Sequence, residues 1–300
     1  MALLVVGTLA FDDVETPFGR VEKVLGGSAT YFSYAASFFT DVRLVGPVGD
    51  DFPMKHIDLL KARSIDCGGV VTLKGQKTFH WSGRYEGDMN EAQTLDVHLN
   101  VLETFKPDLP AHFRSTPYVF LANGAPELQM NVLSQMEKPR FAVCDTMNLW
   151  IENSLEPLKK VFQSVDGVII NEGEARMLAK DRNIIQAGNK ILDMGPRIVI
   201  IKKGEYGAYL CCSEGQFAIP AFPASQVKDP TGAGDSFAGG VMGYLASVDD
   251  LSFSSLKKAM VYGTLVASFN IEDFSLERFK RLQRKEIDDR FNAFIQFITV

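Results

Sequence analysis

Short apolar runs alternate with longer amphipathic stretches along most of this 300-residue chain. Continuously apolar short segments are typical of strands that are buried on both faces of a sheet. Six such runs predict strands at Leu3–Val6, Val42–Val45, Tyr118–Ala122, Phe141–Cys144, Gly167–Ile170 and Ile198–Ile201. Helical patterns lie between them at Ala29–Phe39, Met54–Ala62, Leu128–Met136, Leu155–Phe162 and Glu172–Lys180, and the pattern is helical almost to the end after Asp235. This alternation predicts a mostly parallel sheet covered by helices on both faces, an α/β fold.

Two segments break this rhythm and alternate apolar with polar side chains. Val70–Tyr85 does so about a central turn, with the period of a solvent-facing hairpin, and Val14–Val24 is similar. Together they predict a small β-sheet outside the main sheet, a lid formed by about residues 10–25 and 68–90. We therefore expect a single domain, residues 1–300, that carries this lid.

The predicted lid is rich in aromatic residues, among them Phe79, Trp81 and Tyr85. Exposed aromatic side chains on a small sheet need a partner that covers them. Two partners are open at this point, a ligand that the lid closes over and a second copy of the chain in a homodimer.

Composition excludes several classes of function. The net charge of −6 and the pI near 5.4 argue against a nucleic-acid partner, although a local positive patch can still bind a nucleotide. The cysteines lie in apolar runs without C-x-x-C spacing, at Cys67, Cys144, Cys211 and Cys212. They are expected to be buried, reduced thiols. The N-terminus lacks the basic segment of a signal peptide, and no apolar run is long enough to span a bilayer. We expect a soluble cytoplasmic protein with no membrane partner.

The segment from Lys228 to Ala246, KDPTGAGDSFAGGVMGYLA, places a loop of small residues directly before a helical pattern. The free N–H groups at a helix start, and the positive end of the helix dipole, bind anions and most often phosphate. Asp235 follows the loop at once, and an acid at an anion site is expected to exchange a proton with the ligand. The helix dipole should keep this carboxylate ionised. A simpler interpretation makes Asp235 an N-capping residue after a glycine turn.

The string DPTGAGDSFAGG resembles the C-terminal signature of the PfkB family, the ribokinase-like ATP-dependent kinases of carbohydrates and nucleosides. Further matches follow in the family's order and cover nearly the whole chain. They are Gly7–Asp12 at the first strand, the pair Gly26–Gly27, the turn Gly46–Asp50, the N-x-x-E motif Asn171–Glu174 and Lys202–Gly204 at a strand end. The resemblance implies a ribokinase-like fold, a three-layer α/β/α arrangement with a mostly parallel sheet and a small β-sheet lid. It also implies transfer of the γ-phosphoryl group of ATP to a hydroxyl group.

The resemblance and the positions of the residues assign roles around the glycine loop. Asp235 is the general base, and the N–H groups of Gly232, Ala233 and Gly234 form an anion hole for the phosphoryl group. The acceptor is expected to meet Asp12, Gly26, Gly27 and Asn123. The nucleotide is expected to meet Asn171, Glu174, Lys202, Gly204 and Thr231. Among metals, Mg²⁺ is expected at Glu174 through water, and a monovalent cation such as K⁺ is expected near Asp229.

Several of these positions also have ordinary structural interpretations. Asn171 and Glu174 have the spacing of a helix capping box. Lys202 can be a surface charge, and Asp12 can be a solvated acid at the end of a strand. Gly26–Gly27 can be a simple turn, although the helical pattern that follows favours a second ligand-facing helix start.

The sequence departs from the family pattern where an asparagine often follows the glycine pair and touches the substrate. Tyr31 lies in that neighbourhood here, and Trp81 and Trp150 add further aromatic surfaces. Such surfaces stack on a nucleobase as well as on a sugar face. We expect a sugar as the acceptor, with a nucleoside as the alternative.

The sequence argues against three other functions. A dinucleotide-binding oxidoreductase needs G-x-G-x-x-G after the first strand, and that segment reads Gly7–Asp12 without such a loop. A Walker A nucleotidase needs G-x-x-x-x-G-K-[ST], which does not occur. A non-catalytic ligand-binding or regulatory protein on the same fold has no need of an acid at Asp235, so this residue favours the enzyme.

Overall fold

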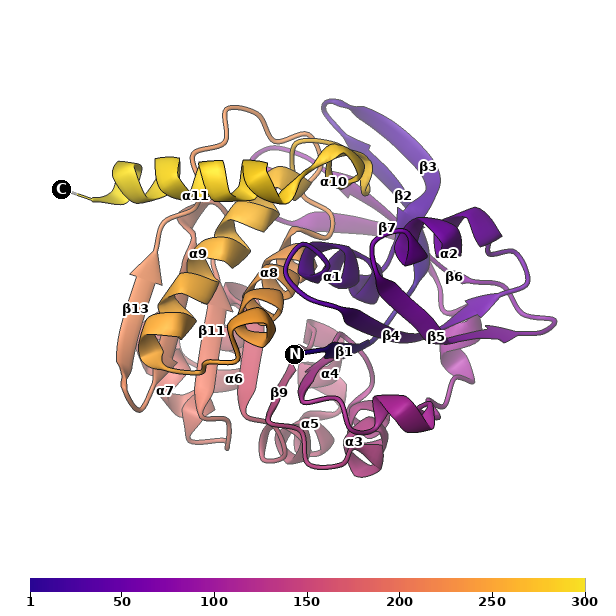
Figure 1. Ribbon diagram of the computed structural model, residues 1–300, viewed down its shortest axis with the longest axis horizontal. Coiled ribbons are helices and arrows are strands. Elements are labelled where there is room, and N and C mark those ends of the chain that lie inside the picture. The colour runs from indigo at the N-terminus through magenta and orange to yellow at the C-terminus, as the bar shows by residue number, and fades with distance from the viewer. Residues whose placement is uncertain (300) are drawn as a thin grey trace.

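The computed structural model describes residues 1–299, in which nine strands form a large sheet in the order β13-β12-β11-β10-β9-β8-β1-β4-β5 (Figure 1). Its strands are β1 (Leu3–Val6), β4 (Val42–Gly49), β5 (Ile65–Leu73), β8 (Tyr118–Leu121), β9 (Phe141–Cys144), β10 (Gly167–Asn171), β11 (Ile198–Lys202), β12 (Ala208–Cys212) and β13 (Gly215–Ile219). All neighbours pair in parallel except β12, which pairs antiparallel with both β11 and β13. All six strands predicted from apolar runs are confirmed.

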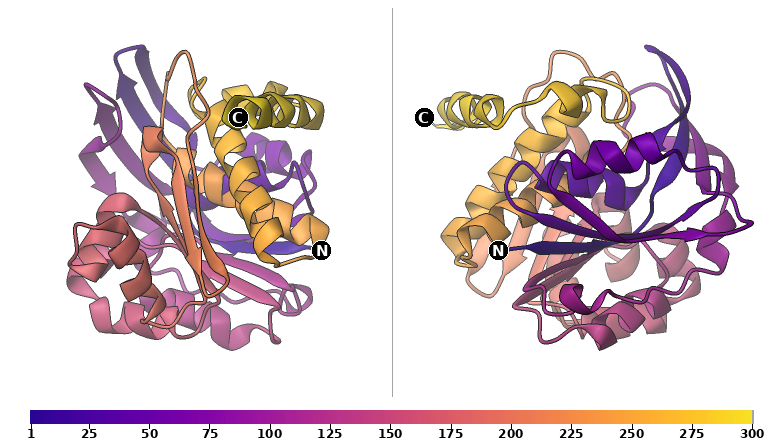
Figure 2. Two further views of the ribbon diagram at one scale, coloured as in Figure 1. Left: turned by 90° about the vertical axis from the view of Figure 1, so that its left-hand side faces the viewer. Right: turned by 45° about the vertical axis from the view of Figure 1, so that its right-hand side comes forward.

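Helices cover both faces of this sheet (Figures 1 and 2). On one face lie α1 (Ser28–Ala36), α2 (Met54–Lys61), α8 (Ala233–Val248), α9 (Phe253–Asn270), α10 (Glu277–Arg281) and α11 (Arg284–Ile298). On the other lie α3 (Pro126–Gln135), α4 (Asn148–Asn153), α5 (Leu155–Phe162), α6 (Glu172–Ala179) and α7 (Ile184–Leu192). Short 3₁₀ turns occur at Asn100–Glu103, Ala111–Phe113 and Gly204–Tyr206.

The central strand β1 shows why the sheet needs both helix layers. Its side chains alternate between two separate hydrophobic cores, Leu3 and Val5 in one and Leu4 and Val6 in the other. Because successive side chains of a strand point to opposite faces, a fully apolar strand is stable only between two covering layers. The predicted three-layer α/β arrangement is confirmed.

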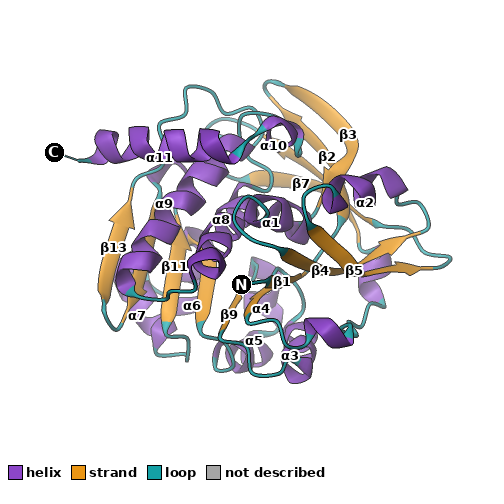
Figure 3. Cartoon of the chain, in the orientation of Figure 1, coloured by secondary structure: helices purple, strands orange, loops and turns teal. Residues whose placement is uncertain are grey.

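A second, four-stranded sheet of residues 1–299 stands apart from the large one (Figure 3). Its order is β3-β2-β6-β7, with β2 (Ala10–Thr16), β3 (Gly19–Gly26), β6 (Phe79–Tyr85) and β7 (Ala92–His98). We call it the small sheet. It packs on the body through a core of its own, in which Val14, Tyr85 and Met89 meet Phe274 from the loop after α9.

The predicted hairpin at Val70–Tyr85 is wrong. Residues up to Leu73 belong to β5, which pairs in parallel with β4 in the large sheet. β6 instead pairs in parallel with β2 and antiparallel with β7. β5 is the edge strand of the large sheet and its side chains alternate between buried and exposed. A half-exposed edge strand therefore has the same period as a hairpin strand, and the period alone does not identify its partner.

No helix within residues 1–299 combines the length and the apolar character that crossing a membrane requires. All four cysteines lie in the described part of the chain as free thiols, and Cys67, Cys144 and Cys211 are buried, as expected.

Candidate active site

The glycine loop is held in a conformation that only glycine fits at its centre. Gly232 is the N-cap of α8 and has φ 74°, in the left-handed region. A Cβ atom at this position would lie 2.3 Å from Cγ of Tyr31. The side-chain amide of Asn270 donates a hydrogen bond to the carbonyl oxygen of Thr231 at 2.7 Å, which anchors the loop from α9.

The N–H groups of this loop are not equivalent. The N–H of Ala233 donates to the carbonyl oxygen of Pro230 at 3.1 Å, so it is engaged within the turn. Among residues 1–299, the N–H groups of Gly232 and Gly234 have no acceptor. Like the N–H of Asp235, which also has no acceptor among these residues, they stand at the positive end of the α8 dipole and are open to an anion.

Asp235 lies in the first turn of α8 and is partly exposed. Its partial removal from water raises its pKa to about 6, against the opposing effect of the Lys202 ammonium. Desolvation thus outweighs the charge of Lys202 in setting this pKa. The carboxylate is still mostly ionised at pH 7, and it is a stronger base than an ordinary aspartate.

The ammonium of Lys202 interacts with several carboxylates of this site. It ends β11, and its Nζ lies 3.0 Å from the position that a Cβ atom of Gly234 would take. The absence of a side chain at Gly234 therefore lets the ammonium approach the loop. Its charge lowers the pKa values of Asp145, Glu174 and Asp235, which burial raises. An ammonium beside an anion-binding helix start suits the phosphates of a nucleotide.

Asp145 also interacts with Lys202, although the sequence did not lead us to assign this residue to the site. It follows β9 directly and is 4% exposed, and its Oδ1 atom has no hydrogen-bond partner among residues 1–299. Burial raises its pKa well above the usual range, with a further contribution from the charge of Asp235. The signal was present in the sequence as an acid directly after the apolar strand Phe141–Cys144. The expectation that Asp12 lies at the end of the first strand is wrong, because β1 ends at Val6 and Asp12 lies within β2 of the small sheet.

Asn171 and Glu174 form the capping box that their spacing allows. The Glu174 N–H donates to Oδ1 of Asn171 at 2.8 Å, and the Asn171 N–H donates to Oε2 of Glu174 at 2.7 Å. The box places the Glu174 carboxylate at the start of α6, close enough to Asp235 for the two charges to interact. In residues 1–299, no three His, Cys, Asp or Glu side chains gather closely enough to hold a metal ion.

Asp12 faces the loop from the small sheet. It is 4% exposed and accepts a hydrogen bond from the N–H of Gly27. A Cβ atom at Gly26 would lie 1.9 Å from Oδ2 of Asp12, so the carboxylate occupies the space that this glycine leaves. Burial, followed by the charges of Asp229 and Asp235, raises the pKa of Asp12 to about 8. Asp12 is therefore not the solvated acid of the simpler interpretation.

Asp229 and Thr231 connect the loop to the small sheet. Asp229 is 1% exposed, and its carboxylate accepts hydrogen bonds from the N–H groups of Thr231 at 2.9 Å and Ser275 at 3.4 Å. The hydroxyl of Thr231 donates to the hydroxyl of Tyr85 on β6 at 3.4 Å. This contact joins the small sheet to the start of α8.

Asn123 and Gly204 lie at the edges of the candidate site described above. The Asn123 side chain accepts a hydrogen bond from Nε1 of Trp150 at 3.1 Å, which ties it to α4. Gly204 has φ 55°, and a Cβ atom there would lie 2.9 Å from Oδ1 of Asn90, in the loop between β6 and β7. In the described part of the chain, neither residue shares a hydrogen bond with Asp12, Asp229 or Asp235.

Known proteins similar to this chain include kinases of nucleosides and carbohydrates. The model of the pfkB family carbohydrate kinases matches residues 4–278. A cytidine kinase of Thermococcus kodakarensis is 29% identical over 248 residues, which cover 80% of this chain and 87% of the relative. A nucleoside kinase of Thermoplasma acidophilum is 27% identical over 252 residues, covering 83% of this chain and 78% of the relative.

Solved structures show the same fold. The nucleoside kinase of Methanocaldococcus jannaschii, an archaeal member of the ribokinase family, has a TM-score of 0.78 at 20% identity and covers 97% of this chain and 98% of its own. The aminoimidazole riboside kinase of Salmonella enterica has a TM-score of 0.78 at 16% identity and covers 97% of this chain and 100% of its own. The ribokinase-like fold is confirmed. With a family model matched along nearly its whole length, the chain belongs to the pfkB family of carbohydrate kinases.

Proposed function

We propose that this protein transfers the γ-phosphoryl group of ATP to a hydroxyl group of a sugar or a nucleoside. The observation that carries the proposal is the position of Asp235, in the first turn of a helix whose open N–H groups and neighbouring Lys202 suit phosphate. Asp12 lies across the loop, close enough for its charge to interact with Asp235. The proposed base, Asp235, the anion-binding N–H groups at the start of α8 and the proposed acceptor-binding acid, Asp12, thus lie close together.

The chemical step follows from these positions. The acceptor oxygen forms a bond to the γ-phosphorus while the bond from that phosphorus to the bridging oxygen of ADP breaks. The hydroxyl proton passes to the carboxylate of Asp235, and ADP leaves. The open N–H groups of Gly232 and Gly234 and the Lys202 ammonium stabilise the charge on the phosphoryl oxygens. Asp12 orients the acceptor by hydrogen bonding.

The residues at the nucleotide end suit Mg²⁺ bound through water and phosphate. Mg²⁺ prefers oxygen ligands and usually retains several waters beside one or two carboxylates. Asp145 has a carboxylate oxygen without a hydrogen-bond partner among residues 1–299, and Glu174 at the start of α6 is close enough for the two charges to interact. When bound with ATP, the metal would neutralise phosphate charge there. Asp229, a buried acid bonded by backbone N–H groups, is our proposed neighbour of a monovalent cation such as K⁺.

An ATP-consumption screen over pentoses, hexoses and nucleosides, with Mg²⁺ and with or without K⁺, tests the proposal. We expect ATP consumption that depends on one class of acceptor and yields its phosphomonoester. ATP hydrolysis that no acceptor changes, or no turnover with any acceptor, would contradict a sugar or nucleoside kinase.

The pKa of Asp235 predicts the pH dependence of the reaction. A base must be deprotonated to act, so kcat/KM should fall about tenfold per pH unit below the pKa of about 6. It should level off near pH 7, below the pKa of about 8 of Asp12, whose own titration acts on acceptor binding. Rates measured from pH 5 to pH 8 for the wild type and for Asp235→Asn check this. The variant should not show the fall in kcat/KM below pH 6. A wild-type kcat/KM that stays constant across this range would exclude Asp235 as the base.

One observation favours a nucleoside as the acceptor. Trp81 pairs with Asp12 across β6 and β2, and it packs with Val14 and Tyr85. A Cβ atom at Gly83 would lie 2.2 Å from Cζ2 of Trp81, so the indole lies across this glycine. Its Nε1 donates to Oγ1 of Thr94 at 3.2 Å, which fixes the ring. A fixed aromatic face beside the acceptor acid is suited to stacking on a base.

We therefore predict that Trp81→Ala raises the KM for a nucleoside acceptor about tenfold, since stacking on one base contributes roughly 1–3 kcal/mol. Gly83→Ala should act in the same direction by displacing the indole. Phe18→Ala, in the exposed turn between β2 and β3, is the control and should leave the KM unchanged.

The same small sheet is our proposed homodimer surface, because its edge strand β7 exposes Leu95 and Val97. Sedimentation velocity of the Trp81→Ala variant separates the two roles of the aromatic residues. A change in KM alone supports the acceptor role, and a change in sedimentation alone supports the dimer. An unchanged KM together with an unchanged sedimentation profile would rule out both roles for Trp81.

A further inference from the structure

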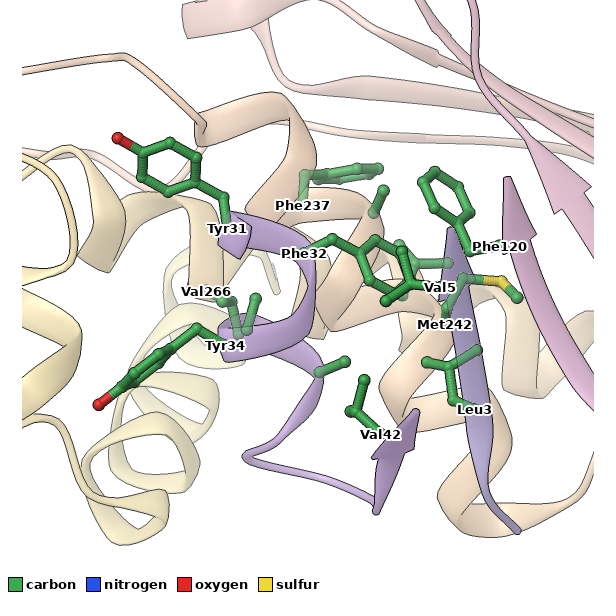
Figure 4. Packing of buried hydrophobic residues seen from close by; sticks show 14 of the residues in the cluster. Leu3, Val5, Tyr31, Phe32, Tyr34, Val42, Phe120, Phe237, Met242 and Val266 are labelled. Atoms are coloured by element: carbon green, nitrogen blue, oxygen red, sulfur yellow. The ribbon is translucent and has the colours of Figure 1, made fainter. Parts of the chain in front are cut away.

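Helix α9 ends in a buried amide beside the start of α8. Figure 4 shows Tyr31 of α1, Phe237 of α8 and Val266 of α9 in the hydrophobic cluster that the three helices share. The last residue of α9 is Asn270, which is 2% exposed. A buried amide has to bond its polar atoms within the protein, so the partners of Asn270 show what it holds in place.

The Asn270 amide has one partner at each end, and both belong to the segment that opens α8. Its Nδ2 atom donates to the carbonyl oxygen of Thr231 at 2.7 Å, and its Oδ1 atom accepts from the hydroxyl of Ser236 at 3.2 Å. Because a carbonyl oxygen can only accept, the amide cannot turn over without losing the bond to Thr231. The Ser236 hydroxyl therefore supports the orientation in which Asn270 donates to the loop.

The bonded carbonyl belongs to the central peptide of a β-turn. The N–H of Ala233 donates to the carbonyl oxygen of Pro230 at 3.1 Å, and Gly232 has φ 74° and ψ 3°, as the third residue of a type II turn has. The C=O of Thr231 and the N–H of Gly232 form one trans peptide, so they point in opposite directions. Since the C=O points to Asn270, the N–H of Gly232 is directed away from α9.

The same peptide has a second orientation with the opposite consequence. The central peptides of type I and type II turns differ by a rotation of about 180°, and glycine as the third residue tolerates both. In the rotated peptide, the carbonyl oxygen of Thr231 would face the phosphate and the N–H of Gly232 would point toward α9. Gly232 therefore permits the observed orientation without enforcing it. The donor that favours this orientation is the Asn270 amide.

We propose that Asn270 is a positioning residue for phosphoryl transfer. Its amide holds the peptide between Thr231 and Gly232 in the type II orientation, so that an N–H group and not a carbonyl oxygen faces the transferred phosphoryl group. The inference rests on the proposed kinase function and deepens it, because it adds a residue that acts on the reaction through the loop. Rotation of the peptide would remove one stabilising donor and place a repelling oxygen beside the phosphoryl charge.

Two substitutions at Asn270 test the role of the amide. Asn270→Leu keeps a similar shape but can neither donate nor accept, so kcat should fall roughly 3- to 10-fold, the range of one neutral hydrogen bond. The KM for the acceptor should change less than kcat, because the acceptor contacts lie elsewhere. Asn270→Ala should cause a smaller loss, since the space that it opens admits a water that donates to Thr231.

Thr264→Val is the matched control for a general loss of stability. Thr264 lies on the same helix and is 6% exposed, and its hydroxyl donates to the carbonyl oxygen of Met260 at 2.9 Å. The variant thus also loses a buried hydrogen bond to a backbone carbonyl, but this carbonyl is not in the loop. It should lower the Tm and leave kcat unchanged.

Titration with inorganic phosphate reports the orientation of the peptide without turnover. The N–H signals of Gly232 and Gly234 are followed by NMR in protein labelled with ¹⁵N-glycine while phosphate is added. Both should shift in the wild type and in Thr264→Val, because both N–H groups are open at the start of α8. In Asn270→Leu the Gly232 signal should respond much less. The Gly234 signal should still shift, because its N–H is not part of the central peptide of the turn.

An unchanged kcat for Asn270→Leu, or a Gly232 signal that responds to phosphate as in the wild type, would overturn the inference. Loss of the response at Gly232 and Gly234 together, with a lower Tm, would also overturn it and assign Asn270 to the stability of the whole loop. A wild type in which phosphate shifts neither signal has no anion site for Asn270 to arrange, which contradicts the inference as well. The expected phosphate responses without phosphoryl transfer in the ATP-consumption screen would support the role of Asn270 and contradict the kinase.

Discussion

Replacing Asp235 with asparagine is expected to lower kcat by roughly 10²–10⁴-fold, the range for the loss of a positioned acid–base group. Asparagine keeps the size and the first-turn position but cannot accept the hydroxyl proton. Because phosphoryl transfer depends mainly on positioning and charge stabilisation, the open N–H groups and Lys202 should leave measurable residual activity. Steady-state kinetics with the acceptor found in the screen measure the loss.

Asp13→Asn is the matched control for this variant. Asp13 neighbours Asp12 in β2, but its carboxylate accepts from the N–H of Lys23 at 2.7 Å and pairs with His80 at 3.1 Å, away from the loop. It should keep kcat within a few-fold of the wild type. If Asp235→Asn also turned over within a few-fold of the wild type, the base would have to be another group.

Gly232→Ala is expected to have the second largest effect, on both stability and catalysis. Alanine in the left-handed region costs roughly 1–2 kcal/mol, and its Cβ would lie 2.3 Å from the ring of Tyr31. Relief of this clash must move the ring or the loop, which misplaces the N–H groups of Gly232 and Gly234. Loss of one such donor typically lowers kcat about 10²–10³-fold.

Gly75→Ala separates backbone strain from the steric clash. Gly75 also has a positive φ, 77°, but within residues 1–299 no atom beyond its chain neighbours lies within 4 Å of its Cβ position. Gly75→Ala should lower the Tm only through the backbone strain of alanine at a positive φ, and it should leave kcat unchanged. Equal kinetics for the Gly232→Ala variant and the wild type would show that the loop does not hold the phosphoryl group.

Much of the fold was predictable because its signals are local. Apolar runs such as Leu3–Val6 identify buried strands, since a strand with both faces apolar requires two covering layers. The antiparallel strands β12 and β13 were missed. The pairing of β5 was also wrong, because an edge strand and a hairpin strand have the same period of exposure.

The site was predictable where residue type and position coincide. Glycines before a helix followed at once by Asp235 predict an anion site with an acid, and an acid directly after an apolar strand, as at Asp145, predicts a side chain at the carboxyl edge of the sheet. Asp145 directly follows β9, and its interaction with Lys202 arises only because β9, β10 and β11 are neighbours in the sheet.

By itself, then, the sequence determined the layers, the glycine loop and the acid that follows it, because these depend on periodicity and on residues adjacent in the chain. Tertiary structure decided the properties that depend on distant contacts. It set the pKa of Asp235 at about 6, because burial and Lys202 act on the group together. It also placed the Tyr31 ring from α1 beside Gly232 and the amide of Asn270 from α9 beside the carbonyl oxygen of Thr231.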